Sequence, residues 1–274
     1  MMSGREGPVN GTKYPASSNL DGTAEASRSP ALTKNGYVDI ELFAGSGGMT
    51  LGLARVGLSP DYLFELNWHC CETLRYNAEG ERRSVTGAVH QEDVSRVDWS
   101  AICDPVRLLS GGPPCQPFSL GGKHLAERDD RNQFPATLRA IRELSPAVVL
   151  LENVPGLARD SFRPYLDYIG RQIECPSVAP LPDELWEDHD VRIRQYQGAK
   201  GYEPEYQVRR WMLNAADFGV AQARVRLFFV ATRVDLSAVD PLPTPRHSHA
   251  PIIPPGHCRE RSGTDPSADI QFTH

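Results

Sequence analysis

Short apolar runs alternate with amphipathic segments between residues 37 and 233. The apolar runs predict buried β-strands at residues 37–45, 61–67, 106–112, 147–154 and 226–233. Between them, apolar positions recur at helical spacing at residues 49–58, 69–78 and 131–145. Strands that alternate with helices in this way predict an α/β protein with a mostly parallel sheet flanked by helices. Ligands of such sheets bind at the carboxyl ends of the strands.

The pattern divides the chain into three parts. Residues 1–36 are rich in Gly, Ser, Thr, Pro and Asn and predict a disordered N-terminal arm. Residues 37–235 form the predicted catalytic domain, in which residues 171–208 lose the periodicity and suggest a surface insertion. Residues 236–274 form a Pro- and His-rich tail without further periodicity.

Composition narrows the class of protein. The 274 residues carry a formal net charge of -6, 40% of them are hydrophobic, and none of the apolar runs is long enough to span a bilayer. The N-terminus lacks the apolar stretch of a signal peptide, so we expect a soluble cytoplasmic protein whose six cysteines are free thiols. The acidic balance argues weakly against a nucleic-acid partner, but residues 192–233 hold eight Lys and Arg against three Asp and Glu, which leaves one basic face possible.

The stretch DIELFAGSGG predicts a strand, a glycine turn and a helix. Such a turn lets a ligand approach the backbone, and the helix N-terminus offers free N–H groups. A plain strand-to-helix turn is the alternative. Glu65 lies at the end of the next predicted strand and Asp93 at the end of the third unit, where carboxylates commonly bind ribose hydroxyls or read an adenine amino group. Either acid alone is more often a surface carboxylate. One polar feature at each of three strand ends predicts an adenosine-type cofactor.

Cys115 lies in the stretch SGGPPCQPFS, where Pro113 and Pro114 restrict the backbone before it. A buried structural thiol is the usual role of a free cysteine. This cysteine, however, is in a loop just after a predicted strand, where a thiolate would be a strong nucleophile.

Two further strand ends carry charged side chains. Glu152 follows the apolar run AVVLL, where partial desolvation would raise its pKa and make it a proton donor near neutrality; a solvated loop acid is the alternative. A predicted strand carries Gln222, Arg224 and Arg226 at alternate positions, so their side chains would share one face. They could form bidentate hydrogen bonds with a carboxyl, a phosphate or a base edge. A metal site is not expected, because the spacings of the tail residues match no standard site: His247, His249, His257 and Cys258.

Taken in order, these motifs resemble those of the cytosine C5 methyltransferases of DNA. The match comprises FAGSGG, Glu65 in ELNW, Asp93–Val94, GGPPCQPFS, Arg131 in DDRNQF, ENV from Glu152, and QARVR from Gln222. The resemblance implies a Rossmann-like fold dependent on S-adenosylmethionine (AdoMet), with Cys115 attacking C6 of a flipped cytosine and Glu152, Arg224 and Arg226 supporting the reaction. It assigns to the cofactor Phe43, Ala44, Gly45, Ser46, Gly47, Gly48, Glu65, Asp93, Val94, Pro114 and Phe134. It assigns to the substrate Pro113, Gln116, Ser119, Asn153 and Gln222.

The sequence also departs from the family pattern. It has no closing G-N-[SA]-V segment, the residues after 235 would be only the start of a target-recognition region, and Arg107 stands where aspartate is common. Three hypotheses therefore remain. The chain is the catalytic part of a split restriction-modification type enzyme that acts on double-stranded DNA with a second polypeptide. Alternatively, it is a truncated fragment that binds AdoMet without turnover, or a relative of the tRNA-methylating branch.

Overall fold

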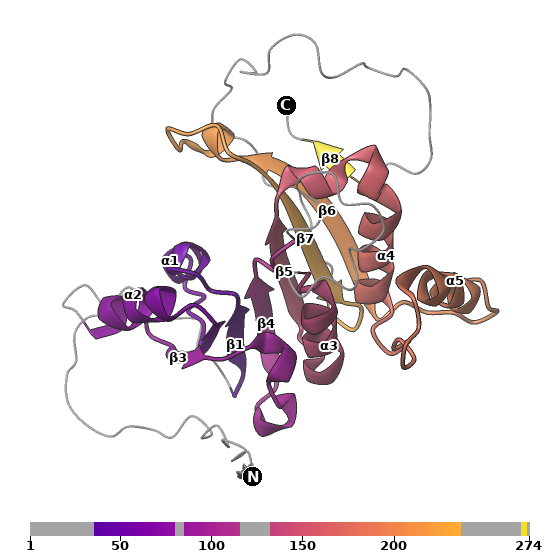
Figure 1. The fold of residues 1–274 in the computed structure, drawn as a ribbon, viewed down its shortest axis with the longest axis horizontal. Coiled ribbons are helices and arrows are strands. Elements are labelled where there is room, and N and C mark those ends of the chain that lie inside the picture. Colours follow the sequence, from indigo (N-terminus) through magenta and orange to yellow (C-terminus); the bar gives the residue numbers. More distant parts are fainter. Residues whose placement is uncertain (1–35, 80–84, 116–131, 237–269, 273–274) are drawn as a thin grey trace, which may run out of the picture.

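The computed structural model describes residues 36–79, 85–115, 132–236 and 270–272, which form one mixed sheet covered by helices (Figure 1). The strand order is β3-β2-β1-β4-β5-β7-β6-β8. The strands are β1 Val38–Leu42, β2 Tyr62–Glu65, β3 Ala88–Gln91, β4 Val106–Gly111, β5 Val148–Asn153, β6 Tyr206–Asn214, β7 Val225–Arg233 and β8 Ile270–Phe272.

The first five strands are parallel, which confirms the predicted fold class. Strand β7 runs antiparallel between β5 and β6, and β8 pairs in parallel with three residues of β6. The carboxyl ends of β1 to β5 and the amino end of β7 therefore lie along the same edge of the sheet. The order of the strands changes direction between β1 and β4, and sheets of this kind bind their ligands at such a point.

Helices connect the strands. They are α1 Gly48–Arg55, α2 Trp68–Glu79, α3 Phe134–Leu144, α4 Arg163–Glu174 and α5 Trp186–Gln197, with 3₁₀ turns η1 Val94–Arg96, η2 Trp99–Ala101, η4 Pro155–Ala158, η5 Asp160–Phe162 and η6 Ala215–Phe218. None of the helices in the described part of the chain combines the length and apolar character needed to cross a membrane.

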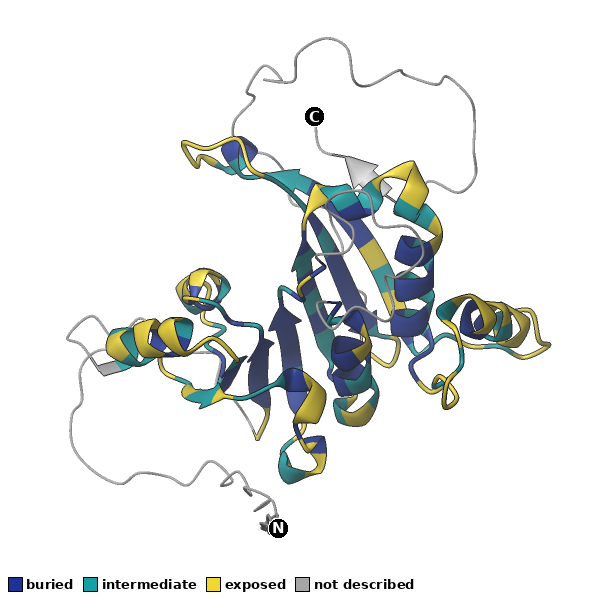
Figure 2. Ribbon diagram, viewed as in Figure 1, coloured by how far each residue is buried: buried dark blue, intermediate teal, exposed yellow. Residues whose placement is uncertain are grey.

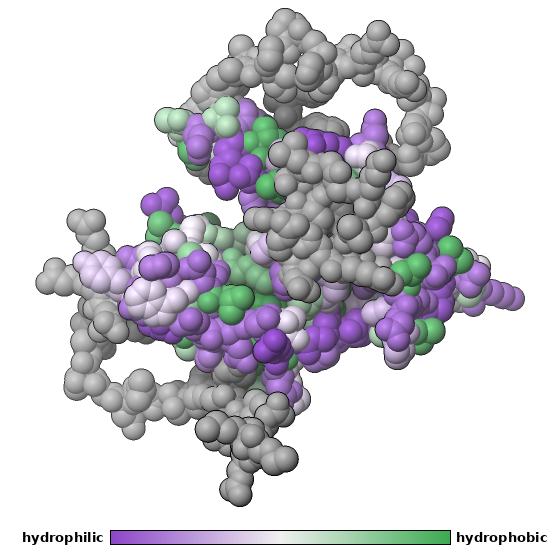
Figure 3. Space-filling model, in the orientation of Figure 1, coloured by the Kyte–Doolittle hydropathy of each residue, from purple (hydrophilic) through white to green (hydrophobic). Residues whose placement is uncertain are grey.

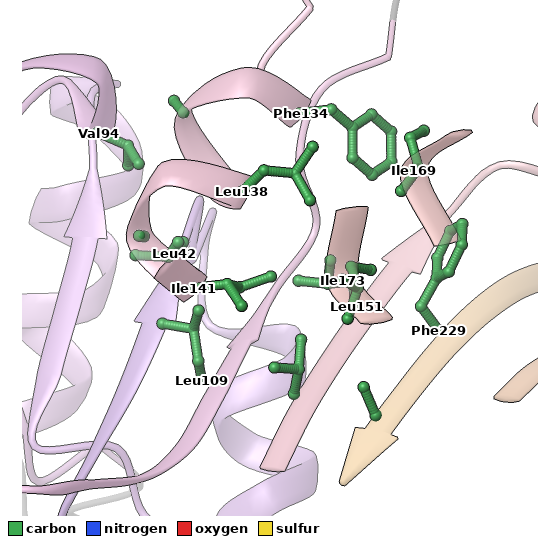
Figure 4. Close-up of a cluster of buried hydrophobic side chains, with 14 of the residues drawn as sticks. Leu42, Val94, Leu109, Phe134, Leu138, Ile141, Leu151, Ile169, Ile173 and Phe229 are labelled. Carbon is green, nitrogen blue, oxygen red and sulfur yellow. The ribbon is translucent and has the colours of Figure 1, made fainter. Parts of the chain in front are cut away.

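The main hydrophobic core lies between the sheet and helices α3 and α4. Leu109, Leu151 and Phe229 from three neighbouring strands meet Ile141 of α3 and Ile169 of α4 there (Figure 4). A smaller cluster lies on the other face of the sheet, where it consists of Ala44, Leu63, Leu74 and Val85. The central strands are buried, whereas the outer surfaces of the helices are exposed (Figure 2).

The structure differs from the sequence prediction between residues 171 and 208. This range, where the sequence loses its periodicity and suggests a surface insertion, contains the end of α4, all of α5 and the start of β6. Helix α5 is polar along most of its length and buries His189, Asp190 and Ile193, so its sequence lacks an apolar stripe. Of the N-terminal arm (residues 1–36) the structure describes residue 36 alone, and of the tail (residues 236–274) it describes residue 236 and strand β8.

Candidate active site

The loop after β4 places Cys115 at the carboxyl edge of the sheet. The backbone of Cys115 pairs with Asn132 in an isolated antiparallel bridge, and the Gln133 N–H donates to the Pro114 carbonyl at 3.1 Å. From β5, the side chain of Asn153 donates to the carbonyl of Pro113 at 2.9 Å. The segment that carries the thiol is therefore held from two sides.

The Cys115 residue is only 7% exposed, and burial raises the pKa of its thiol to about 12. The thiol is therefore protonated near neutrality in this conformation. Because a thiolate is the nucleophilic form, attack requires the proton to leave and the surroundings of the sulfur to change.

Glu152 and Arg226 form an ion pair beside this loop. Arg226 Nε lies 2.7 Å from Glu152 Oε1, with side chains that are 22% and 25% exposed. A Cβ on Gly112, in the loop that leads to Cys115, would lie 3.6 Å from Glu152 Oε2. The carboxylate therefore lies next to both the arginine and the thiol-bearing loop. Our prediction for Glu152 rested on apolar surroundings, but the structure places a cation there.

The predicted arrangement of Gln222 and Arg224 on a strand is wrong. Strand β7 begins at Val225, so both residues belong to the preceding turn, where their side chains are exposed. Asn214 fixes this turn, because its side-chain oxygen accepts a hydrogen bond from the Arg224 N–H at 3.0 Å. Of the three polar residues, only Arg226 lies on the strand, and only Arg226 reaches Glu152.

The glycine turn after β1 forms an open cradle. Phe43, Gly45 and Gly47 all have positive φ angles, of 53°, 54° and 90°. A Cβ built on Gly45 or on Gly48 would meet no atom within 4 Å. Ser46 and Gly48 are exposed, whereas Ala44 and Gly47 are buried and a Cβ on Gly47 would lie 2.8 Å from Leu74 Cδ2, so the turn between β1 and α1 is open on one side and packed on the other.

Glu65 binds the same turn. Its carboxylate accepts hydrogen bonds from the Gly45 N–H at 2.8 Å and from the Asn67 N–H at 2.7 Å. Each carboxylate oxygen has a second lone pair, so ribose hydroxyls could still be accepted. Asp93 caps η1 by accepting from the Ser95 N–H at 2.9 Å, and it remains partly exposed at the end of β3.

Two predicted cofactor residues have buried side chains in the hydrophobic core. Phe134 is fully buried, with its ring 6.2 Å from that of Phe229, and Val94 is 2% exposed (Figure 4). Phe43, the first residue of the glycine turn, packs against the same hydrophobic cluster as these two side chains. Gln116 and Ser119 lie outside the described residues.

The basic segment between residues 192 and 233 does not form a face of unpaired cations. Five of its arginines are in ion pairs with acidic side chains: Arg192, Arg194, Arg210, Arg226 and Arg233. Among the described residues, no cluster of three or more His, Cys, Asp or Glu side chains has the geometry to hold a metal ion.

Sequence reasoning missed two buried acids on β1. Glu41 on β1 is 1% exposed, and its Oε2 accepts a hydrogen bond from the Thr50 hydroxyl at 2.8 Å. Asp39 is also buried and forms a bidentate ion pair with Arg107. Arg107 Nε donates to Asp39 Oδ1 at 2.9 Å, and Arg107 Nη2 donates to Asp39 Oδ2. Arg107, noted above as a departure from the family pattern, thus neutralises a carboxylate 68 residues earlier in the chain.

The strand order, the glycine cradle after β1 and the thiol loop after β4 together define a Rossmann-like methyltransferase fold. A family profile described as C-5 cytosine-specific DNA methylase matches residues 37–174 and 198–256. The chain belongs to this family, whose members use AdoMet as the methyl donor.

Similar proteins include several named type II methyltransferases. M.NgoMIV of Neisseria gonorrhoeae is 33% identical over 72% of this chain and 52% of its own length, and M.Eco47II of Escherichia coli is 37% identical over 75% and 42%. The chain thus spans about half the length of these two relatives. M.AquIA of a Picosynechococcus strain is 35% identical over 75% of both chains, so it has a similar length. A solved structure described as a DNA modification methyltransferase encoded within an E. coli prophage is 25% identical, with a TM-score of 0.50, and aligns over 74% of this chain and 49% of its own.

Proposed function

We propose that this chain is the catalytic part of a DNA (cytosine-5-)-methyltransferase, which transfers a methyl group from AdoMet to C5 of a cytosine flipped out of double-stranded DNA. One observation carries the proposal. Cys115 and the Glu152–Arg226 pair share a sheet edge with the glycine cradle, because β1 pairs directly with β4 and β4 with β5. A nucleophile, an acid and a cofactor cradle are thus available to one substrate.

The proposed chemistry begins when Cys115 loses its proton and the thiolate sulfur attacks C6 of the cytosine. The electron pair of the C5–C6 double bond then moves toward C5. Glu152 in its protonated form would donate a hydrogen bond to N3 and accept one from the exocyclic amino group, and so favour charge build-up on the ring, while Arg226 would keep Glu152 in place. When bound, AdoMet would supply an electrophilic methyl group to C5 and leave as the thioether S-adenosylhomocysteine. Water would then take the C5 proton, the electron pair of that C–H bond would re-form the C5–C6 double bond, and cleavage of the S–C6 bond would return the thiolate.

The remaining residues receive binding roles in this proposal. The turn from Phe43 to Gly48 would cradle the cofactor, and Glu65 and Asp93 would bind its ribose and adenine. Pro114, Val94 and Phe134 would border that pocket, the last two through their backbones, because their side chains are buried. Pro113, Gln116, Ser119, Asn153, Gln222 and Arg224 would contact the nucleotide.

A second polypeptide, or a continuation of this chain, would supply target recognition and the rest of the cofactor pocket. Two observations support this idea. The chain matches only about half the length of M.NgoMIV and M.Eco47II, and the relative M.AquIA is about as long as this chain. Large apolar side chains are also exposed around α1 and the loop after β2, among them Leu51, Val56 and Leu66. The space-filling view shows hydrophobic side chains at the surface near α1, where such a partner could pack (Figure 3).

The test is transfer of labelled methyl from AdoMet to unmethylated DNA by the purified chain, with Cys115→Ser as the nucleophile variant and Cys103→Ser, at an exposed thiol, as the matched control. Transfer that disappears only in Cys115→Ser supports the proposal for the chain alone. AdoMet binding without transfer, even after the product of the neighbouring reading frame is added, would favour the truncated, non-catalytic fragment. Transfer to tRNA but not to DNA would contradict the proposed substrate.

A further inference from the structure

The position of Cys115 depends on residues outside the motif that contains it. Asn132 pairs with Cys115 through its backbone, and the next residue, Gln133, binds the carbonyl of Pro114. Asn132 and Gln133 immediately precede α3. Any movement of Asn132 would therefore be transmitted directly to the backbone that carries the thiol.

Asn132 is in turn attached to α4. Its side-chain amide donates a hydrogen bond of 2.7 Å to the hydroxyl of Tyr165, and its side-chain oxygen accepts one of 3.3 Å from the Phe134 N–H. Asn132 and Tyr165 are only 6% and 4% exposed. A buried bond of this kind competes little with water and fixes its partners more firmly than a surface contact.

The ring of Tyr165 rests on helix α5. Its centroid lies 5.3 Å from that of Trp186 in an edge-to-face contact and 5.7 Å from that of Tyr168. Trp186 is the first residue of α5, and it lies in residues 175–197, which the family profile does not match. A segment additional to the family pattern therefore contacts the tyrosine that holds Asn132.

We propose that Tyr165 is a positioning residue for Cys115, that it acts through Asn132, and that α5 stabilises its ring. The proposal gives a role to the segment between α4 and β6, which sequence reasoning left without one. It rests on the proposed function only in treating Cys115 as the nucleophile. The placement of the thiol can be measured whether or not the chain methylates DNA.

The measurement is the rate at which a small alkylating reagent labels each cysteine of the full chain, read residue by residue with mass spectrometry over a range of pH. Tyr165→Phe removes the hydroxyl and keeps the ring. Tyr168→Phe is the matched control, because Tyr168 is on the same helix, is 5% exposed, and directs its hydroxyl to Gln172 and His189 instead. Cys103, which is exposed, and Cys71 and Cys175, which are buried, serve as internal references.

We expect Tyr165→Phe to raise the labelling rate of Cys115 about three- to tenfold, the effect of losing one buried hydrogen bond, and to lower the pH at which labelling becomes fast. Cys71 and Cys175 should remain protected, and Tyr168→Phe should leave Cys115 unchanged. Equal labelling of Cys115 in the two variants would overturn the proposal. So would a rise at Cys71 and Cys175 as well, since general loosening would then explain the result.

The contribution of α5 is tested in the same way. Trp186→Ala removes the ring that contacts Tyr165, whereas Tyr196→Ala removes an exposed ring of the same helix. Faster labelling of Cys115 in Trp186→Ala alone supports the stabilising role of α5. Unchanged labelling in Trp186→Ala would show that α5 does not contribute to the position of the thiol.

Discussion

Glu41 should make the stability of the protein depend on pH in a direction unusual for a carboxylate. Burial raises the pKa of Glu41 to about 7 from an ordinary value of 4.5, although hydrogen bonds from Thr50 lower it. Between these two values the folded chain binds a proton that the unfolded chain has released. The free energy of unfolding therefore falls as the pH rises through this window, and the loss is complete above pH 7.

The size of the effect follows from the difference between the two pKa values, which corresponds to roughly 3 kcal/mol. Most of it, roughly 2–3 kcal/mol, should develop between about pH 5 and pH 8. A Glu41→Gln variant stays neutral over this range, and its side-chain oxygen can still accept the hydrogen bond from Thr50. The variant should therefore gain 2–3 kcal/mol relative to the native chain between about pH 5 and pH 8.

Denaturant unfolding at about pH 5 and pH 8 measures this gain, because groups that titrate equally in both proteins cancel in the comparison. Glu72→Gln is the control, since the Glu72 side chain is 49% exposed and should give no such difference. A stability difference between Glu41→Gln and the native chain that is the same at both pH values would refute the reasoning, since Glu41 would then be ionised, or protonated, throughout.

Three further predictions concern other parts of the fold. Replacing Arg107 by Leu should lower the free energy of unfolding by about 3–5 kcal/mol, because the buried Asp39 carboxylate loses its partner. Adding the change Asp39→Asn should recover much of this loss in the same denaturant assay. Burial lowers the pKa of His189, so the unfolded chain is protonated first and the stability of the fold should decrease as the pH drops below 6.5. The variant His189→Gln should show a smaller decrease in thermal unfolding between about pH 7.5 and pH 5.5. An equal decrease in the variant and the native chain would contradict this prediction. Arg226→Ala should destabilise the fold by about 1–2 kcal/mol by leaving Glu152 unpaired, whereas Arg224→Ala, at an exposed turn, should leave the unfolding midpoint unchanged.

The sequence predicted which residues lie at the strand ends better than it predicted which side chains contact one another in the fold. Cys115, Glu152 and Arg226 were found because each lies beside a buried strand, and such strands have a local apolar signature. Their neighbours carry no such signature. The Asn132–Tyr165 hydrogen bond joins residues 33 apart, and the Arg107–Asp39 pair joins residues 68 apart.

The errors also have physical reasons. The alternation in QARVR imitates a strand, but the side chain of Asn214 binds the backbone of Arg224 and holds it in a turn. The cofactor role of Phe134 stays a prediction, and the sequence did not show that its ring packs against Phe229 in the core. Sequence spacing does not tell which way a residue at the start of a helix points. Tertiary packing decides this.

Gly111, the last residue of β4, lies so close to β1 that a Cβ on it would be 2.6 Å from the Leu42 carbonyl oxygen. The cofactor cradle begins one residue after Leu42, and the loop that leads to Cys115 begins one residue after Gly111. Because residue 111 has no side chain, β1 and β4 can pair closely at this point, which places the two loops next to each other. Any larger residue would widen the gap between the two loops while leaving each loop intact. A change at residue 111 would therefore act on the spacing of the two loops, although Gly111 belongs to neither of them.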